Sequence, residues 1–336
     1  MDAIILVGGQ GTRLRPLTTT RHKSLVPLLN RPAIEYLFEW LARSGIERAV
    51  LALGQANEDL AATYPAGLRG GLEIVPIIER ERLESGGAIR NAARTTGIDG
   101  RFIVLNGDVY ADFDLRAAIV AHESFGADLT LALCEVDDPS AFGIAVTDSE
   151  GLVTGFVEKP PRGEEPSRLV NAGVWIFEPG LVDEIPAGAV RVEETLFPSL
   201  VARRRRVLGY RFAGPWADLG TPQRYLEASR MLLGEGNAIA GDVHVGAGAD
   251  IRGSAVGGGS VIGPEVRISD SILWEGVAVG ERAQIERSIL ADGVVVGTGA
   301  RLTGVVAGQG AYIASGTQVP AGTSIEARGR YDGPHG

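Results

Sequence analysis

The sequence predicts a three-layer α/β domain with a mainly parallel sheet, followed by a parallel β-helix. In residues 1 to about 235, short apolar runs typical of buried strands alternate with amphipathic helical stretches. From about residue 237, glycine, alanine and valine dominate, and aliphatic residues recur every 17 residues. We therefore expect one domain over 1–235, a β-helix over 237–330 and a flexible tail over 331–336.

The first half opens on an apolar strand over residues 3–7 that runs into a glycine-rich loop. Asn30 and Pro32 mark the start of a helix with one apolar face, and Gly45 ends it. We expect the next strands over 49–53, 102–106, 129–134 and 174–177, and the next helices over 87–95, 114–124 and 221–233. Ligands of such sheets lie at the carboxyl ends of the strands, so residues 8–12 and 106–108 should share one edge.

Three columns of aliphatic residues define the second half. Their spacing of six, five and six residues describes a triangular coil in which each side points one aliphatic side chain inward. A disordered tail lacks such apolar order. The columns are Val245, Ile262, Val279, Val296 and Ile313; Ile251, Ile268, Ile285, Leu302 and Val319; and Val256, Leu273, Leu290 and Ala307.

Composition excludes several classes of function. The net charge of −10 argues against general nucleic-acid binding. No apolar run is long enough to span a membrane, and the chain begins with a strand rather than a signal peptide. Cys134 is the only cysteine, which excludes an internal disulfide and a cysteine-rich zinc site. We expect a protein of the reducing cytoplasm, without nucleic-acid or membrane partners.

The loop after the first strand indicates a phosphate ligand. Its glycines allow backbone N–H groups to approach a ligand closely, and Arg13 and Arg15 add two permanent cations. A tight turn without a ligand is the weaker alternative.

Residues 6–18, Leu-Val-Gly-Gly-x-Gly-Thr-Arg-Leu-x-Pro-Leu-Thr, resemble the signature of the sugar-1-phosphate nucleotidylyltransferases. Val7 favours the mannose-1-phosphate guanylyltransferase branch. The resemblance implies a Rossmann-like catalytic domain whose substrates are a nucleoside triphosphate and a sugar 1-phosphate. The repeats resemble the hexapeptide-repeat left-handed β-helix. By resemblance, the nucleotide-binding residues of the loop are Leu6, Gly8, Gly9, Gly11, Thr12 and Arg13.

The resemblance extends to two further nucleotide-binding segments. Lys23 matches the lysine of the second signature, which binds triphosphate oxygens, but His22 stands where the family has proline. This replacement predicts a looser loop around Lys23. Ser85 and Gly86 match a segment that packs under the nucleotide, and Glu84 replaces its usual glycine.

Glu79 stands where thymidylyl- and uridylyltransferases have a glutamine that contacts the base. A carboxylate only accepts hydrogen bonds, and guanine presents two adjacent donors, so Glu79 would favour guanine. The charged run 79–82 is equally consistent with a solvated loop.

Two aspartates match the metal ligands of the family. Asp108 follows the strand 102–106, and Asp218 lies in the motif Trp-Ala-Asp-Leu-Gly-Thr-Pro. The resemblance implies that they share one Mg²⁺, which binds hard carboxylate oxygens. A capping role before Thr221 is the alternative for Asp218, but it leaves the rest of the motif unexplained.

A second group of residues matches the sugar side of the family's site. The resemblance assigns Glu158 and Asn171 to sugar hydroxyls and Lys159 to the sugar phosphate. Gly143 would let the backbone reach the sugar, and Glu193 is a further sugar-side candidate.

The reaction that the resemblance implies needs no nucleophilic side chain, because a sugar 1-phosphate already carries the attacking charge. Catalysis would fall to Arg13, Lys23, Asp108 and Asp218. We expect GDP-mannose synthesis from GTP and mannose 1-phosphate. The alternatives are a glucose-1-phosphate thymidylyl- or uridylyltransferase, a heptose-1-phosphate guanylyltransferase, a non-catalytic regulatory subunit, or an acyltransferase, a frequent function of hexapeptide repeats. The repeat half should serve structure and assembly, giving a homo-oligomer through the β-helix.

Overall fold

The computed structural model describes residues 1–333, and the chain divides into two compact units. Unit 1 comprises Met1–Gly9 and Ile34–Trp216. Unit 2 comprises Gln10–Ala33 and the chain from Ala217 onward. This division differs from a boundary near residue 236, because the segment Gln10–Ala33 packs with the repeat half.

Unit 1 is built on a ten-stranded sheet with the order β11-β10-β12-β7-β1-β4-β6-β5, in which β9 joins β12 to β13. The central strands β6, β4, β1 and β7 are parallel, which agrees with the mainly parallel sheet that the sequence predicts. No strand was expected over the residues of β6. Strands β5, β10, β11 and β12 pair antiparallel, which the sequence did not indicate. The bounds are β1 (Asp2–Val7), β4 (Arg48–Leu53), β5 (Gly67–Arg69), β6 (Leu72–Ile78), β7 (Phe102–Asn106), β9 (Leu129–Glu135), β10 (Gly143–Thr147), β11 (Val153–Glu158), β12 (Leu169–Phe177) and β13 (Val207–Arg211).

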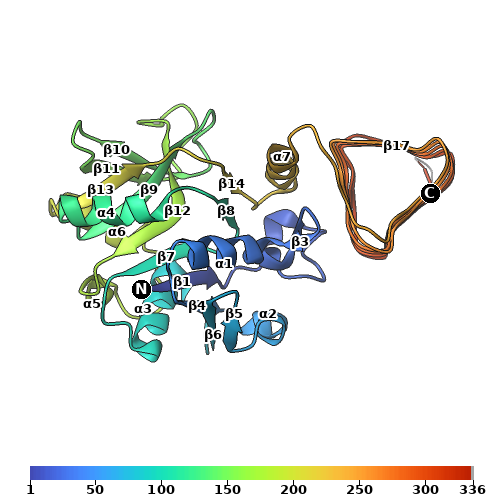
Figure 1. Ribbon diagram of the computed structural model, residues 1–336. Helices are drawn as coiled ribbons and strands as arrows, with labels where there is room; N and C mark the ends of the chain where they lie inside the picture. The colour runs from blue at the N-terminus through green and yellow to red at the C-terminus, as the bar shows by residue number, and fades with distance from the viewer. Residues whose placement is uncertain (334–336) are drawn as a thin grey trace. The chain divides into compact units, whose positions relative to one another are not determined.

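Helices cover this sheet (Figure 1). On one face, Ile89 and Ala92 of α3 share a buried core with Ile4 and Val50 of the sheet. The helices expected from the sequence are confirmed within three residues of their predicted starts. Asp114 caps α4 by accepting a hydrogen bond from Ala117 N. The helices are α1 (Ala33–Arg43), α2 (Glu58–Thr63), α3 (Glu84–Thr96), α4 (Leu115–Phe125), α5 (Leu181–Glu184) and α6 (Leu196–Ala202). Short elements are η1 (Thr12–Leu14), η2 (Lys23–Leu25), η3 (Gln55–Asn57), β2 (Pro27–Leu28), β3 (Arg31–Pro32), β8 (Val109–Ala111) and β14 (Trp216–Asp218).

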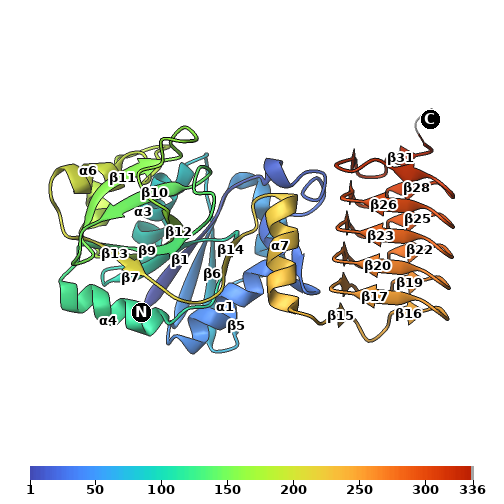
Figure 2. The same cartoon turned by 90° about the horizontal axis from the view of Figure 1, so that it is seen from above.

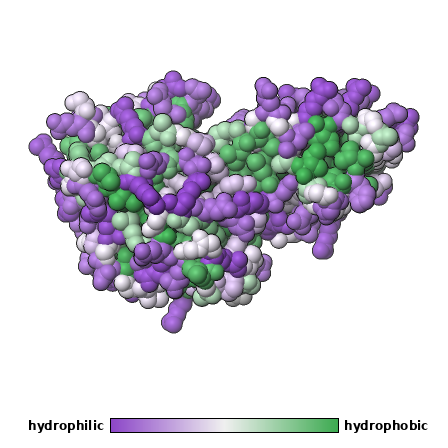
Figure 3. Space-filling model, in the orientation of Figure 1, coloured by the Kyte–Doolittle hydropathy of each residue, from purple (hydrophilic) through white to green (hydrophobic). Residues whose placement is uncertain are grey.

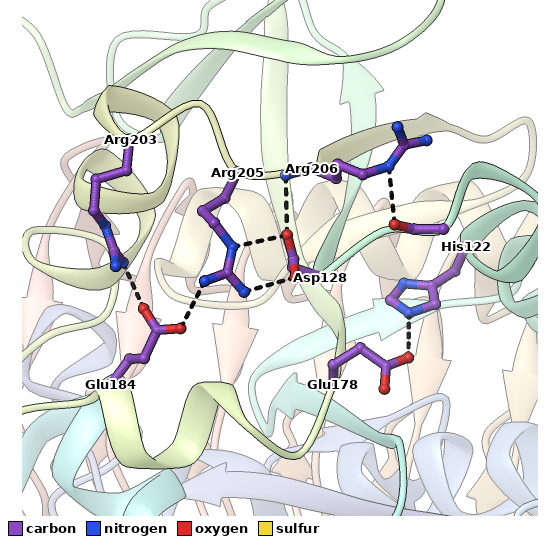
Figure 4. Close-up of polar contacts among 8 residues, drawn as sticks. His122, Asp128, Glu178, Glu184, Arg203, Arg205 and Arg206 are labelled. Carbon is purple, nitrogen blue, oxygen red and sulfur yellow. Dashed lines mark hydrogen bonds and ion pairs between the residues drawn. The ribbon is translucent and has the colours of Figure 1, made fainter.

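A network of ion pairs joins the loops at one edge of unit 1 (Figure 4). Arg205 donates to both oxygens of Asp128, at 2.9 and 2.6 Å, and also contacts Glu184 at 3.1 Å. Nearby, the buried ring of His122 contacts Glu178 Oε1 at 3.1 Å. The Arg205 side chain holds the pKa of Asp128 below its usual range, whereas burial lowers the pKa of His122. These groups connect elements and lie outside every predicted site.

In unit 2, helix α7 (Pro222–Leu233) begins at Thr221, whose side chain accepts from Arg224 N. The following coils form a left-handed parallel β-helix with three sheets of six, six and five strands (Figures 1 and 2). The strands are β15 (Ala238–Ile239), β16 (His244–Val245), β17 (Asp250–Arg252), β18 (Ala255–Val256), β19 (Val261–Ile262), β20 (Arg267–Ser269), β21 (Ile272–Leu273), β22 (Ala278–Val279), β23 (Gln284–Glu286), β24 (Ile289–Leu290), β25 (Val295–Val296), β26 (Arg301–Thr303), β27 (Val306–Ala307), β28 (Tyr312–Ile313), β29 (Gln318–Val319), β30 (Ser324–Ile325) and β31 (Arg330–Tyr331).

The predicted aliphatic columns form the core of the β-helix, apart from its first coil, where Val245 is 48% exposed. The tail expected from residue 331 is wrong at its first residue, because Tyr331 pairs with Ile313 in β31. The last coil carries one extra residue between Val319 and Ile325, so Ile325 and Tyr331 lie 18 residues beyond their partners Ala307 and Ile313. Residues 334–336 of that expected tail lie outside the described residues.

Within residues 1–333, no helix has the length and apolar character that crossing a membrane requires. Cys134 lies in β9, where burial raises the pKa of its thiol to about 12. The thiol is therefore protonated and chemically quiet at neutral pH.

Candidate active site

The carboxyl ends of β1 and β7 meet, as the sequence predicts. These strands are parallel neighbours, and Gly107 N donates to Leu6 O at 3.0 Å. A Cβ on Gly107 would lie 2.3 Å from Val7 Cγ1, so only glycine lets the chain cross the end of β1 so closely. Asp108, partly buried, is therefore held beside the start of the loop that carries Gly8 and Gly9.

Glu79 lies at the same edge, directly after β6. Its N–H donates to Leu53 O at 2.8 Å, and its side chain is turned inward with only 4% of the residue exposed. Both carboxylate oxygens lie 4.0 Å from the position that a Cβ on Gly8 would occupy. The solvated-loop alternative is wrong for Glu79, although it holds for Arg80 and Glu81, which are exposed.

Within the described part of the chain, one oxygen of the Glu79 carboxyl lacks a hydrogen-bond donor. The carboxyl accepts a backbone hydrogen bond from Leu83, but Oε1 is buried and has no hydrogen-bond partner among the described residues. Burial raises the pKa of Glu79 to about 7. A buried acceptor without a donor is costly, so it marks a place where a ligand's N–H groups would fit.

Two residues of this edge were missed by the sequence reading. Asn57 is buried, and its Nδ2 donates to Val7 O at 2.5 Å. Gly54 approaches so closely that a Cβ there would lie 3.0 Å from Gly8 O. Gly54 directly follows a predicted strand, as Gly8 does. This position could have indicated that Gly54 lies at the same edge of the sheet.

The sugar-side residues come from β10, β11 and β12. Glu158 ends β11, and one of its carboxylate oxygens lies 2.6 Å from the Cβ position of Gly143, so a side chain at 143 would collide with it. Lys159 Nζ pairs with Glu158 Oε1 at 3.0 Å, and Lys159 adopts a left-handed φ of 45°. Such strain in a non-glycine residue is typical of functional sites.

Asn171 is held in one orientation by its own strand. Its Oδ1 accepts from Trp175 Nε1 at 2.7 Å and from Gly173 N at 3.1 Å. The amide nitrogen is thereby left as the group that can donate to a hydroxyl. Trp216 Nε1 donates to Ala172 O at 2.9 Å and so ties the late tryptophan motif to this strand.

Glu193 is buried and accepts a hydrogen bond from Ser85 Oγ at 2.6 Å. Burial raises the pKa of Glu193, and Arg191 pairs with Glu158 at 3.6 Å beside it. Ser85 is thus engaged with a sugar-side residue. Gly86 packs under the same segment, because a Cβ there would lie 2.9 Å from Val190 Cγ2.

Glu84, the residue that replaces the family's glycine, has a φ of +56°. This left-handed conformation favours glycine, so the glutamate at this position is strained.

In unit 2, the signature loop folds onto itself. Gly11 has a φ of 62°, and its carbonyl accepts from Thr18 Oγ1 at 2.7 Å. The Cβ position of Gly11 lies 3.0 Å from Lys23 Cβ, so the two signatures are in contact. At the position where the family has proline, His22 Nδ1 accepts from Ser24 N at 3.2 Å and caps the turn that starts at Lys23.

Arg13 and Asp218 meet at Gly220, while Thr12 begins the short turn that carries Arg13. The Cβ position of Gly220 lies 2.6 Å from Asp218 Oδ1 and 3.2 Å from Arg13 Nη2. Arg224 donates to Asp218 Oδ2 at 2.8 Å. Two of the four predicted catalytic side chains are therefore brought together within unit 2.

The donor chemistry of Asp108 and Asp218 fits a hard divalent cation, since both supply carboxylate oxygens. In residues 1–333, no cluster of three or more His, Cys, Asp or Glu forms a complete metal site. Asp218 Oδ2 already accepts from Arg224, so a bound cation would share this carboxylate with the guanidinium.

Comparison with known proteins agrees with this geometry. The nucleotidyl transferase family model matches residues 2–235, and the model of the GlmU-like C-terminal hexapeptide domain matches residues 238–332. The chain is 38% identical to "Mannose-1-phosphate guanylyltransferase" of Mycobacterium tuberculosis over 69% of its length and 65% of that protein. It is 35% identical to "Mannose-1-phosphate guanyltransferase" of Candida albicans and 31% identical to the catalytic subunit beta of that enzyme in Drosophila melanogaster, again over 69% of this chain.

The matched region spans 62% to 65% of the length of these relatives. The nucleotidyl transferase match covers well over half of this chain and includes both the glycine loop and the late aspartate motif. The chain belongs to the nucleotidyl transferase family.

Proposed function

We propose that this protein transfers GMP from GTP to mannose 1-phosphate and releases pyrophosphate. The observation that carries the choice of base is Glu79, a buried carboxyl with an unpartnered oxygen beside Gly8. Guanine offers N1–H and N2–H₂ as adjacent donors, which suit two carboxylate oxygens. The names of the curated relatives support the same base and the same sugar.

The reaction is a single displacement. An oxygen of the sugar phosphate forms a bond to the α-phosphorus, and the bond from that phosphorus to the bridging oxygen breaks, so that pyrophosphate leaves with the electron pair. No proton needs to be removed from the nucleophile, because the phosphate is already anionic. The residues must therefore align the two substrates and balance developing negative charge.

We assign that work to the charged side chains that match the family's motifs. Arg13 and Lys23 would bind the triphosphate, with Leu6, Gly8, Gly9, Gly11 and Thr12 supplying backbone contacts. Lys159 would hold the sugar phosphate, and Glu158, Asn171 and Glu193 would hold sugar hydroxyls across the opening kept by Gly143. Ser85 and Gly86 would act indirectly, by positioning Glu193 and its segment.

Nucleotidyl transferases of this family generally use a divalent metal ion. We propose that the ion is Mg²⁺ and that Asp108 and Asp218 hold it. Bound there, it would neutralise charge on the phosphates during transfer.

We further propose that the chain works in the cytoplasm as a homo-oligomer joined through the β-helix. The quiet Cys134 thiol suits a reducing compartment. Hydrophobic residues reach the visible surface of the β-helix (Figure 3). Val261 is 52% exposed and Val295 is 39% exposed. Both lie in one outward column of neighbouring strands, where a second copy would cover them.

A substrate matrix tests the proposed function. Pyrophosphate release is measured with GTP, ATP, UTP and dTTP against mannose, glucose and heptose 1-phosphates, each with and without Mg²⁺. We expect GTP with mannose 1-phosphate to give the highest kcat/KM. A preference for UTP or dTTP would overturn the base assignment, and no release with any pair would favour a regulatory subunit.

A further inference from the structure

One face of the β-helix is covered, and this distinguishes it from the others. The outward side chains of Ala255, Ile272 and Ile289 lie on neighbouring strands of one sheet and are 0%, 2% and 2% exposed. Outward Val261 on another sheet is 52% exposed. The unit that contains the β-helix also contains the segment Gln10–Ala33 and α7.

Hydrogen bonds identify the loop as part of that cover. Asn30 Nδ2 donates to Ala238 O and to Val256 O, both at 3.0 Å, and so bridges the first two coils. On the same corner, Trp274 is 2% exposed and its Nε1 donates to Tyr225 Oη at 3.1 Å. Tyr225 in turn donates to Pro27 O. Pro27 and Asn30 both follow the turn that carries Lys23.

Arg21 anchors the other side of that turn. Its Nη2 pairs with Asp292 Oδ2 at 2.7 Å, and its guanidinium lies 5.0 Å from the centre of the Trp274 ring. Asp292 also accepts from Glu275 N at 3.3 Å, so its carboxylate is fixed by the preceding coil. Arg21 and Asp292 are 29% and 18% exposed, which limits the screening of this pair by solvent.

These contacts involve residues on both sides of Lys23 in the sequence. Arg21 lies two residues before it, Pro27 four residues after it, and all their partners are on α7 or on the coils. Lys23 in turn touches Gly11, so fixing the turn also fixes the glycine loop. A loop with this many glycines has high conformational entropy, and its order must come from such anchors.

We propose that the β-helix is the positioning element of the triphosphate-binding loop, with Arg21, Asn30, Trp274 and Asp292 as positioning residues. The expected effect on kinetics rests on the proposed function. The contact of residues 21–30 with α7 and the coils, called docking below, rests on geometry alone. This positioning role goes beyond assembly, because the coils would hold the loop that carries Arg13 and Lys23 in place.

Hydrogen exchange tests the docking without any substrate. Asp292→Asn keeps the shape of the side chain and the bond from Glu275 N, but removes the charge that faces Arg21. We expect amides in the peptide 15–30 to exchange roughly tenfold faster than in the unmodified protein. The matched control is Asp250→Asn, which breaks a pair with Arg252 within one strand of the β-helix and should leave that peptide unchanged.

Kinetics test the consequence. Asp292→Asn and Arg21→Gln should each raise KM for GTP roughly three- to tenfold, with KM for mannose 1-phosphate unchanged, and the double variant should be no worse than either single one. Equal increases in both KM values would indicate general damage and overturn the proposal, as would unchanged exchange in the double variant. If the unmodified protein is inactive with every triphosphate, the proposed function is wrong. Hydrogen exchange would still show whether the β-helix orders residues 15–30.

Discussion

At the scale of single residues, Glu79 carries the substrate choice. Replacing it with glutamine keeps the shape but adds a donor, so it would erode discrimination against UTP and dTTP. We expect the ratio of kcat/KM for GTP over UTP to fall about ten- to a hundredfold in Glu79→Gln, equivalent to about 1.5–3 kcal/mol. Glu81→Gln, on the exposed part of the same loop, is the control and should leave the ratio unchanged.

The same residue predicts a pH dependence. Burial raises the pKa of Glu79 to about 7, and only the carboxylate can accept both guanine donors. Activity with GTP at low substrate should therefore rise between pH 6 and 8, and Glu79→Gln should lose this rise. Stability runs the other way, because a raised carboxyl pKa stabilises the fold at low pH and this contribution is lost as the pH rises from about 4.5 through 7.

Glu84 offers a prediction about strain. Its left-handed φ of +56° costs about 1–2 kcal/mol for a non-glycine residue. Glycine would relieve this strain, but its greater freedom in the unfolded chain would offset part of the stabilisation. Glu84→Gly should raise the free energy of unfolding by about 0.5–1 kcal/mol in urea titrations. Glu81→Gly, where φ is not positive, should not stabilise the protein, and a similar gain in both variants would count against the strain.

Some site residues could be predicted from the sequence and others could not. Gly8 and Asp108 follow strands that the sequence predicts, so their shared edge followed from the fold class. The place of Glu79 at that edge did not, because no strand was expected over Leu72–Ile78. Asn57 was missed because it lies in a short turn, and its contact with Val7 O is visible only in three dimensions. The bond from Ser85 to Glu193 spans 108 positions, and no local pattern encodes it.

At the scale of elements, the buried His122 predicts how stability depends on pH. It sits between Thr130, at 2.8 Å, and Glu178, and burial lowers its pKa below 6.5. The unfolded chain therefore binds a proton near pH 6.5 that the folded protein does not. The free energy of unfolding should therefore fall as the pH drops from 7.5 to 5.5.

His122→Gln removes that titration, so the difference in stability between variant and unmodified protein should shrink as the pH falls to 5.5. Chemical denaturation at both values measures it. A difference that stays constant with pH would show that His122 titrates alike in both states.

Periodicity explains which elements were predictable. Strands β1, β4 and β7 are short apolar runs and the coils have a regular repeat of apolar residues, and these elements were predicted. Strand β6 was not. Strands β10 to β12 carry no such signal for direction, because antiparallel pairing depends on which strand lies beside them. The place of Ile325 in the last coil was not predicted, because one additional residue after Val319 lengthens that side of the coil.

At the scale of the whole molecule, the sequence did not predict that residues 10–33 pack with the β-helix. The pair of Arg21 with Asp292 joins residues 271 positions apart, and single charged residues carry no repeat that could indicate it. The expected role of the repeat half in structure and assembly did not include these contacts.

Self-association can be tested on the exposed column. Val261→Glu combined with Val295→Glu places charges on that outward face and should shift the mass measured by analytical ultracentrifugation toward the monomer. Gln284→Glu, exposed on a different sheet, is the control. A protein that is monomeric before any substitution, or an oligomer unaffected by both charges, would contradict this interface.

Above all, we propose that Asp108 and Asp218 act on the same Mg²⁺. The most direct measurement is pyrophosphate release from GTP and mannose 1-phosphate by Asp108→Asn, Asp218→Asn and the double variant. Asp112→Asn, near Asp108 and paired with Arg43, is the control. We predict a loss of at least about a hundredfold in each single variant and no further loss in the double one. Activity within threefold of the unmodified protein in either single variant, or losses that multiply in the double variant, would contradict the account.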